Sequence, residues 1–242
     1  MIEIFAERGF STIYPENTLL GFTKAFESGA HGVTADVRMT QDEELVLMQD
    51  LTVDRTTDGS GQVSALTLND IFRLDAGAWK GIAYENEPVP TLASLLGSKP
   101  PQAKVILNIY EERGYRQQIF FSKLGELITQ FQNKSSLIIS SSSYKLLSQA
   151  KERLDGISCA LMPASGLRGI FARHLFRHSV NVDAFHIPAS SVSPGLIRSE
   201  HLCNRQVRAL APIDSYQLLQ VQKAGVDGII ICDPVLGLVY SD

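Results

Sequence analysis

The sequence predicts a closed barrel of eight parallel strands, with helices between them and a small insertion over one end. Short apolar runs alternate with longer amphipathic segments along the whole chain, which is the pattern of repeated βα units. There are eight such runs, and eight parallel strands with intervening helices favour a (β/α)8 TIM barrel over an open doubly wound sheet. The length of 242 residues suits a single barrel of this kind.

The eight strands are expected where short apolar and β-branched runs are bounded by polar or turn residues. They are Ile2–Ala6, Gly32–Val37, Lys104–Tyr110, Ser136–Ser141, Ile157–Met162, Val182–Ile187, Gln206–Leu210 and Asp227–Ile231.

The segments between the strands carry helix signals. The first helix is expected to be capped by Asn17, to end at Gly29 and to face the core with Leu20, Phe22, Ala25 and Phe26. Gly225 is expected to end the last helix in a left-handed conformation. The later helices are expected over Arg116–Gln132, Tyr144–Arg153, Leu167–Arg177, Pro194–Asn204 and Ser215–Ala224.

One region interrupts this alternation. Glu44–Met48 is predicted to return as a strand from the second strand of the barrel, and residues 50–90 then form an insertion rich in Thr, Asp and Gly. Thr67–Leu74 and Leu92–Leu96 are expected to be short helices. No linker divides the chain, so residues 1–242 are expected to form one domain with the insertion over the C-terminal mouth.

Composition excludes several classes of function. A net charge of −4 favours no nucleic-acid partner, which would select a basic face. No apolar run approaches the roughly 20 residues that span a bilayer, so no membrane span is expected. The chain starts directly with strand-like residues and shows no signal peptide, which together with three widely spaced cysteines predicts a cytoplasmic protein.

Polar motifs follow the predicted strands at characteristic intervals. They are Phe5–Gly9, Pro15–Thr18, Val33–Val37, Met48–Asp50 and Asp54–Gly59. Their residues and spacing resemble those of the glycerophosphodiester phosphodiesterase family. This resemblance implies a TIM barrel with a small subdomain over its mouth, and metal-assisted cleavage of phosphodiesters.

The acid–base positions of that family are substituted in this chain. Family members have histidines, as general acid and base, where Glu7 and Gln49 stand. Histidine suits proton transfer near neutral pH because its unperturbed pKa is about 6.5, whereas glutamine exchanges no proton. The substrate-binding arginine of the family is retained as Arg8, but its lysine is replaced by Glu112, which would repel a phosphate.

The metal-binding positions are substituted as well. The resemblance implies a divalent cation held by two glutamates and an aspartate, of which Asp36 remains while Thr34 and Tyr110 replace the glutamates. A cation such as Ca²⁺ takes about six to eight oxygen ligands, usually including several carboxylates. No cofactor is therefore expected, unless a rearranged carboxylate site binds Mg²⁺ or Ca²⁺.

Structural roles compete with chemical ones at these positions. Glu7 paired with Arg8, and Asp36 hydrogen-bonded near Asn17, are as compatible with the sequence as any ligand role. Tyr110 is expected to fill the volume of the lost metal site. Because strand side chains alternate, Thr34 and Asp36 are expected to share a face and to meet residues 108, 110 and 112 at the mouth.

Three functions remain open from the sequence. The first is a degenerate family member without ordinary hydrolytic activity, for which a small anionic or phosphodiester ligand is the expected partner. The second is an active metal-dependent phosphoric diester hydrolase of lipid metabolism, with Glu7, Asp36 and Glu112 as a rearranged carboxylate site. The third is a non-enzymatic sensor or assembly partner. The oligomeric state is not predicted.

Overall fold

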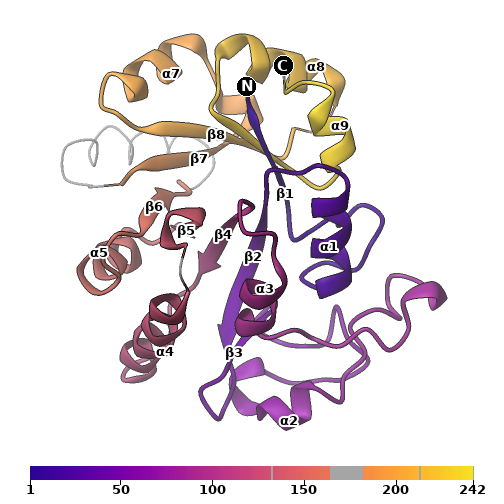
Figure 1. Ribbon diagram of the computed structural model, residues 1–242. Helices are drawn as coiled ribbons and strands as arrows, with labels where there is room; N and C mark the ends of the chain where they lie inside the picture. The colour runs from indigo at the N-terminus through magenta and orange to yellow at the C-terminus, as the bar shows by residue number, and fades with distance from the viewer. Residues whose placement is uncertain (132, 164–181, 213, 242) are drawn as a thin grey trace.

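The structure is a computed structural model that describes residues 1–131, 133–163, 182–212 and 214–241. Within these ranges eight parallel strands close into a barrel, which confirms the predicted (β/α)8 fold (Figure 1). The strands are β1 (Glu3–Ala6), β2 (Gly32–Met39), β4 (Lys104–Ile109), β5 (Leu137–Ser141), β6 (Ser158–Leu161), β7 (Ala184–Pro188), β8 (Gln206–Leu210) and β9 (Gly228–Ile231). They pair side by side in this order around the barrel, and β9 closes it by pairing with β1.

The insertion begins with a strand that reverses direction, as predicted. β3 (Leu45–Leu47) pairs antiparallel with β2, with Val37 opposite Leu47. Residues 50–90 then pack their own small apolar cluster, in which Val53 and Ile71 are fully buried. The segment contains η1 (Val63–Ala65), α2 (Leu68–Ile71) and η2 (Ile82–Tyr84). That the whole chain forms a single domain stays a prediction.

Helices cover the outside of the barrel (Figure 1). They are α1 (Leu19–Glu27), α3 (Leu92–Ser98), α4 (Arg116–Gln130), α5 (Tyr144–Arg153), α7 (Pro194–His201), α8 (Ser215–Ala224) and α9 (Pro234–Leu238). These positions confirm the predicted helices, except that Leu167–Arg177 lies outside the described residues and that α9, capped by Asp233, was not predicted. None of the helices in the described ranges has the length and apolar character needed to cross a membrane.

The start of α1 differs from the prediction in a way that matters for the mouth. Thr18, not Asn17, is the N-cap, and its Oγ1 accepts a hydrogen bond from the Gly21 amide at 3.1 Å. Asn17 instead adopts the left-handed region with a φ of 56°, which asparagine tolerates better than most residues. Its side chain therefore turns away from the helix and bonds to Asp36 on β2.

The barrel interior combines an apolar layer with two buried basic side chains. The apolar layer consists of Phe5, Ile106, Ile138, Ala160, Ala184 and Ile230. His186 and Arg208 face each other across the β7–β8 pairing, and both are about 1% exposed. His186 Nδ1 lies 3.1 Å from the Ser140 hydroxyl. Burial, and then the charge of Arg208, hold the pKa of His186 well below its ordinary value.

This histidine should make the fold sensitive to mild acid. The folded chain keeps His186 neutral, while the unfolded chain takes up a proton as pH falls through about 6.5. Its contribution to stability is thus complete above that pH and is lost below it, with a slope of at most about 1.4 kcal/mol per pH unit. Urea unfolding of the unmodified chain and of His186→Leu across this range should show a smaller pH dependence in the variant. If the free energy of unfolding depends on pH equally in the two proteins, His186 is not the group that makes the fold sensitive to acid.

Candidate functional site at the barrel mouth

Side chains from three neighbouring strands meet at the end of the barrel where the strands finish. They are Glu7 and Arg8 after β1, Thr34 and Asp36 on β2, and Tyr110 after β4. The C-terminal ends of the strands are where TIM-barrel proteins carry their functional residues. The predicted convergence of residues on β2 and β4 is present, because Asp36 contacts both Asn108 and Tyr110.

Asp36 lies at the centre of this site, and its side chain is 2% exposed. Its Oδ1 accepts hydrogen bonds from Asn108 Nδ2 at 3.1 Å and from the Tyr110 hydroxyl at 2.6 Å. Its Oδ2 accepts one from Asn17 Nδ2 at 3.0 Å and lies 3.3 Å from Arg8 Nε. A carboxylate offers about four acceptor positions. All of those positions are directed to groups of the protein itself.

Arg8 is held among three carboxylates. Besides Asp36, its guanidinium contacts Glu7 Oε1 at 3.2 Å and Glu16 Oε1 at 3.5 Å. Its backbone has a φ of 57°, and its amide donates to the buried Thr34 hydroxyl at 3.0 Å. Burial acts to lower the pKa of Arg8, but the surrounding carboxylates, with Asp36 first among them, raise it above its ordinary value. The predicted pairing of Glu7 with Arg8 is thus present, and Thr34 supports the backbone of Arg8.

Tyr110, where the family resemblance implies a glutamate, acts as a hydrogen-bond donor to Asp36. Burial, and then the Asp36 carboxylate, raise the pKa of its phenol well above the ordinary value, so the hydroxyl keeps its proton. The other side of the ring is covered by Arg38, whose guanidinium carbon lies 3.8 Å from the ring centroid. Such stacking is favourable when the cation is sheltered from water. Tyr110 therefore fills the space between the Asp36 carboxylate and the Arg38 guanidinium.

Gln49 and the insertion close another side of the site. The backbone carbonyl of Gln49 accepts hydrogen bonds from Arg38 Nε at 3.1 Å and Nη2 at 2.5 Å. Its side-chain Oε1 accepts one from Arg55 Nη2 at 3.0 Å. Arg55 also binds both oxygens of Glu16, at 2.7 and 3.2 Å, and Asp50 at 2.5 Å. The insertion is thereby joined to the turn that follows β1.

Glu112 lies apart from the Asp36 network and pairs with Arg116. Its Oε2 is 3.4 Å from Arg116 Nε, and Arg116 Nη2 also donates to the carbonyls of Met39 and Thr40. Among the residues that the structure describes, no three His, Cys, Asp or Glu side chains gather so that they could hold a metal ion. The rearranged carboxylate site of Glu7, Asp36 and Glu112 is therefore not assembled in this geometry.

The donor set at the mouth does not fit the divalent cation that the family resemblance implies. A hard cation needs several free carboxylate or carbonyl oxygens. Here Asp36, the one ligand that this resemblance leaves in place, is fully engaged, and the Arg8 guanidinium lies against it. An arginine within ion-pair distance repels a second cation and competes for the same oxygens.

Several residues that complete the site were not predicted from the sequence. Arg38 is two positions after Asp36 on the same strand, so the alternation of strand side chains could have placed it on the inner face. Arg55 and Glu16 are 39 residues apart, and no local pattern connects them. Their contact depends on how the insertion folds back over the barrel.

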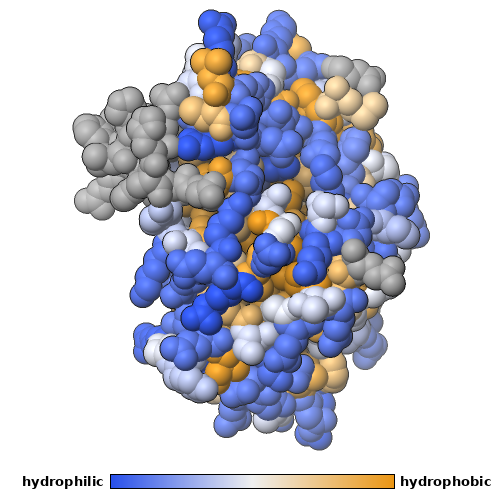
Figure 2. Space-filling model, turned by 60° about the vertical axis from the view of Figure 1, so that its left-hand side comes forward, coloured by the Kyte–Doolittle hydropathy of each residue, from blue (hydrophilic) through white to orange (hydrophobic). Residues whose placement is uncertain are grey.

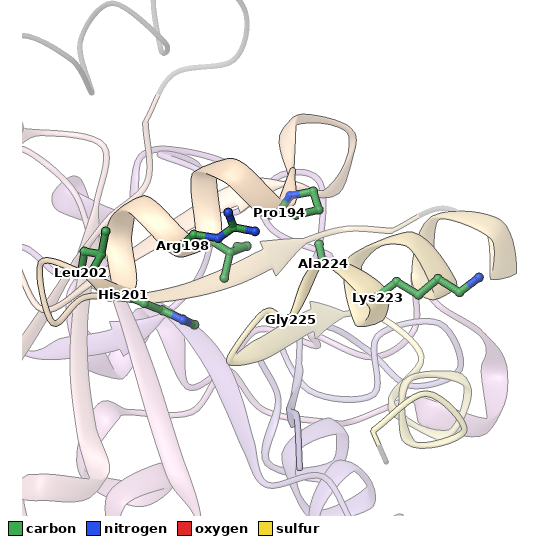
Figure 3. A pocket seen from close by; sticks show the side chains of 8 residues that line it. Pro194, Arg198, His201, Leu202, Lys223, Ala224 and Gly225 are labelled. Carbon is green, nitrogen blue, oxygen red and sulfur yellow. The ribbon is translucent and has the colours of Figure 1, made fainter.

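A hollow lies on the surface away from the mouth. A groove of about 530 Å³ lies on the outside of the barrel between α7 and α8, where Arg198, His201 and Lys223 border Ile197 and Ala224 (Figure 3). No strand end contributes to its lining. The face drawn in Figure 2 is mainly hydrophilic, and its hydrophobic residues lie largely between hydrophilic ones. Because TIM-barrel proteins carry their functional residues at the strand ends, the mouth is a stronger candidate for a functional site than this groove.

Known proteins resemble this chain in both sequence and fold. Residues 8–235 match the model of the glycerophosphoryl diester phosphodiesterase family. A glycerophosphodiester phosphodiesterase of Caldanaerobacter subterraneus is 32% identical over 241 residues, which cover 96% of this chain and 94% of that protein. A glycerophosphodiester phosphodiesterase of Bacillus altitudinis is 27% identical, with 95% of this chain and 94% of that protein covered.

Solved structures agree with these matches. A phosphodiesterase of Oleispira antarctica, in complex with the product sn-glycerol-3-phosphate, has a TM-score of 0.86 at 25% identity and covers 98% of this chain and 96% of its own. A glycerophosphodiester phosphodiesterase of Agrobacterium tumefaciens has a TM-score of 0.84 at 21% identity, over 99% of this chain and all of its own, and supports the fold. This chain belongs to the glycerophosphoryl diester phosphodiesterase family.

Proposed function

We propose that this family member does not hydrolyse glycerophosphodiesters at an ordinary enzymatic rate and that its mouth serves a binding role. The observation that carries the proposal is the saturation of Asp36 by four groups of the protein. A ligand position that already holds an ion pair and three hydrogen bonds must lose them before it can bind a cation. Loss of such buried contacts costs several kcal/mol, which weakens any metal site by orders of magnitude.

The proton-transfer groups support the same proposal. Gln49 has no titratable group, and Tyr110 keeps its proton because its pKa is raised. Glu7 is engaged on one oxygen by Arg8 and lies 3.5 Å from the Cys232 thiol on the other. A phosphodiester hydrolase needs an acid for the leaving group as well as a base for the attacking water. The mouth supplies no such acid–base pair among its described side chains.

Hydrolysis is the second candidate, because relatives that cover more than nine-tenths of this chain bear the name glycerophosphodiester phosphodiesterase. It requires that Glu7, Asp36 and Glu112 rearrange around a cation. The ion pairs of Arg8 and Arg116 would have to open for this to happen. The proposed function and this candidate therefore differ in two measurable properties, turnover and the binding of a divalent cation.

We expect no turnover of glycerophosphocholine or glycerophosphoglycerol above background with Mg²⁺, Ca²⁺ or Mn²⁺. General acid–base groups each contribute typically about 10²–10⁴-fold, and Glu7 and Gln49 stand where the family resemblance implies two histidines. Release of glycerol phosphate, followed with a coupled assay, is the measurement. Turnover of about 1 s⁻¹ or faster that is abolished by Glu7→Gln would establish the second candidate instead.

A further inference from the structure

A small pocket lies beside the Asp36 network, between the insertion and the segment that joins β4 to α4. Its volume is about 200 Å³. Three arginines, Arg38, Arg113 and Arg116, line it together with Glu111, Glu112 and residues of the insertion. The pocket is close to the barrel mouth but does not include Arg8 or Asp36. It shares with the phosphate position that the family resemblance implies only Glu112, which stands where a phosphate-binding lysine is expected.

Arg38 is held rigidly at the wall of this pocket. The residue is 8% exposed, its Nε and Nη2 bind the Gln49 carbonyl, and its guanidinium stacks on Tyr110. In the described part of the chain no group bonds to Nη1, the remaining nitrogen. Arginine stays protonated in proteins, so a largely buried positive charge with an open donor borders the pocket.

Arg116 and Arg113 add two further guanidinium groups. Arg116 uses Nε for Glu112 and Nη2 for the carbonyls of Met39 and Thr40, which leaves Nη1 without a partner among the described residues. Arg113 is exposed, and within the described ranges nothing bonds to its side chain. α4 begins at Arg116, so the positive end of its dipole lies on the same side.

The two glutamates of the pocket do not cancel this charge. Glu111 Oε1 accepts a hydrogen bond from the Ser143 hydroxyl at 2.7 Å, and Glu112 is paired with Arg116. Three arginines against two glutamates leave one positive charge, with open donors on each arginine. Guanidinium groups fixed in this way are suited to bind oxyanions through several charge-assisted hydrogen bonds.

We infer that this pocket binds a small oxyanion, a phosphate or phosphate-monoester group, in place of the family's phosphate position. At the family position Arg8 is neutralised by three carboxylates, so an incoming anion would meet Glu7, Glu16 and Asp36. In the pocket the anion would meet three arginines, Arg38, Arg113 and Arg116, against two glutamates, of which Glu112 is already paired with Arg116. The inference deepens the proposed binding role of the mouth, but it depends on anion affinity and not on the absence of turnover.

Calorimetric titration of inorganic phosphate at constant ionic strength tests this site. The unmodified chain should show saturable binding, and Arg113→Glu should raise the dissociation constant about tenfold or more, because a charge-assisted hydrogen bond becomes a repulsion. Arg198→Glu is the matched control, since it makes the same change of charge on another exposed arginine, in the α7–α8 groove (Figure 3). That control should change the dissociation constant less than about twofold, because exposed charges at a distance are screened.

Arg113 is exposed, so its replacement should leave the fold intact, and circular dichroism of each variant checks this. Absence of saturable binding by the unmodified chain would overturn the inference, as would equal weakening by Arg113→Glu and Arg198→Glu. Binding that is lost in Arg8→Gln but kept in Arg113→Glu would place the anion at the family position and would also overturn it. Hydrolysis of a glycerophosphodiester in the same preparations would contradict the proposed function while leaving this inference standing.

Discussion

Replacement of Asp36 by alanine should destabilise the fold by about 3–5 kcal/mol, the range found when one partner of a buried ion pair is removed. The substitution leaves Asn17, Asn108 and Tyr110 without their acceptor and removes the innermost partner of Arg8. Asp36→Asn should also destabilise, because the amide group can accept on only one of its two heavy atoms. Urea unfolding at neutral pH measures both effects.

Whether Asp36→Ala lowers or raises the free energy of unfolding distinguishes a structural carboxylate from a metal ligand. Carboxylates gathered for a cation repel one another in its absence, so removing one of them should stabilise the metal-free protein. A matched control is Asp155→Ala, at an exposed aspartate, which should alter the free energy of unfolding by less than about 0.5 kcal/mol. Unchanged or increased stability of Asp36→Ala would show that the network around Asp36 does not stabilise the fold.

A five-fold variant should recover divalent-cation binding if the barrel has kept its scaffold and lost only its site. The changes are Glu7→His, Thr34→Glu, Gln49→His, Tyr110→Glu and Glu112→Lys. They return carboxylates around Asp36 and remove the Tyr110 hydroxyl that now binds it. Residues that act as a unit are strongly non-additive, so each single change should have little effect. Calorimetric titration of Ca²⁺ and Mg²⁺ into the variant and the unmodified chain makes the comparison.

The contacts of Arg38 could prevent the five-fold variant from recovering cation binding. Arg38 stacks on Tyr110, and loss of that ring leaves a buried guanidinium without its cover. A variant that is folded by circular dichroism yet binds no cation would show that supporting residues beyond these five have also changed, or that the site lies elsewhere. Metal-dependent turnover by the variant would in contrast confirm that the scaffold is intact.

The fold could be predicted from sequence because its signals are local and repeated. The eight strands alternate with capped helices, and Gly225 ends α8 with a φ of 82°, as its position predicted. The prediction that Asn17 caps α1 was wrong. Asn17 and Thr18 are adjacent, and both residue types are favoured at the N-cap, so the sequence alone does not distinguish them. The choice was decided by a contact with Asp36, which is 19 residues away.

The location of the site could also be predicted, but its present bonding could not. Alternation along β2 places Thr34, Asp36 and Arg38 on one face, which indicates that they meet at the mouth. Whether Asp36 is free or saturated depends on the side-chain rotamers of residues after β1, before α1 and at the end of β4. The link from Arg55 to Glu16 likewise depends on the path of the insertion. Such contacts follow from tertiary packing, for which a single sequence holds no local pattern.

The central claim is that Asp36 is bound by the protein and is not available to a cation. Calorimetric titration of Ca²⁺, Mg²⁺ and Mn²⁺ into the unmodified chain, with the five-fold variant as the comparison, tests it most directly. The geometry predicts no binding by the unmodified chain up to millimolar cation. Stoichiometric binding by the unmodified chain, lost in Asp36→Asn while the fold is retained, would contradict the claim and would show that the Arg8 ion pairs open to form a working metal site.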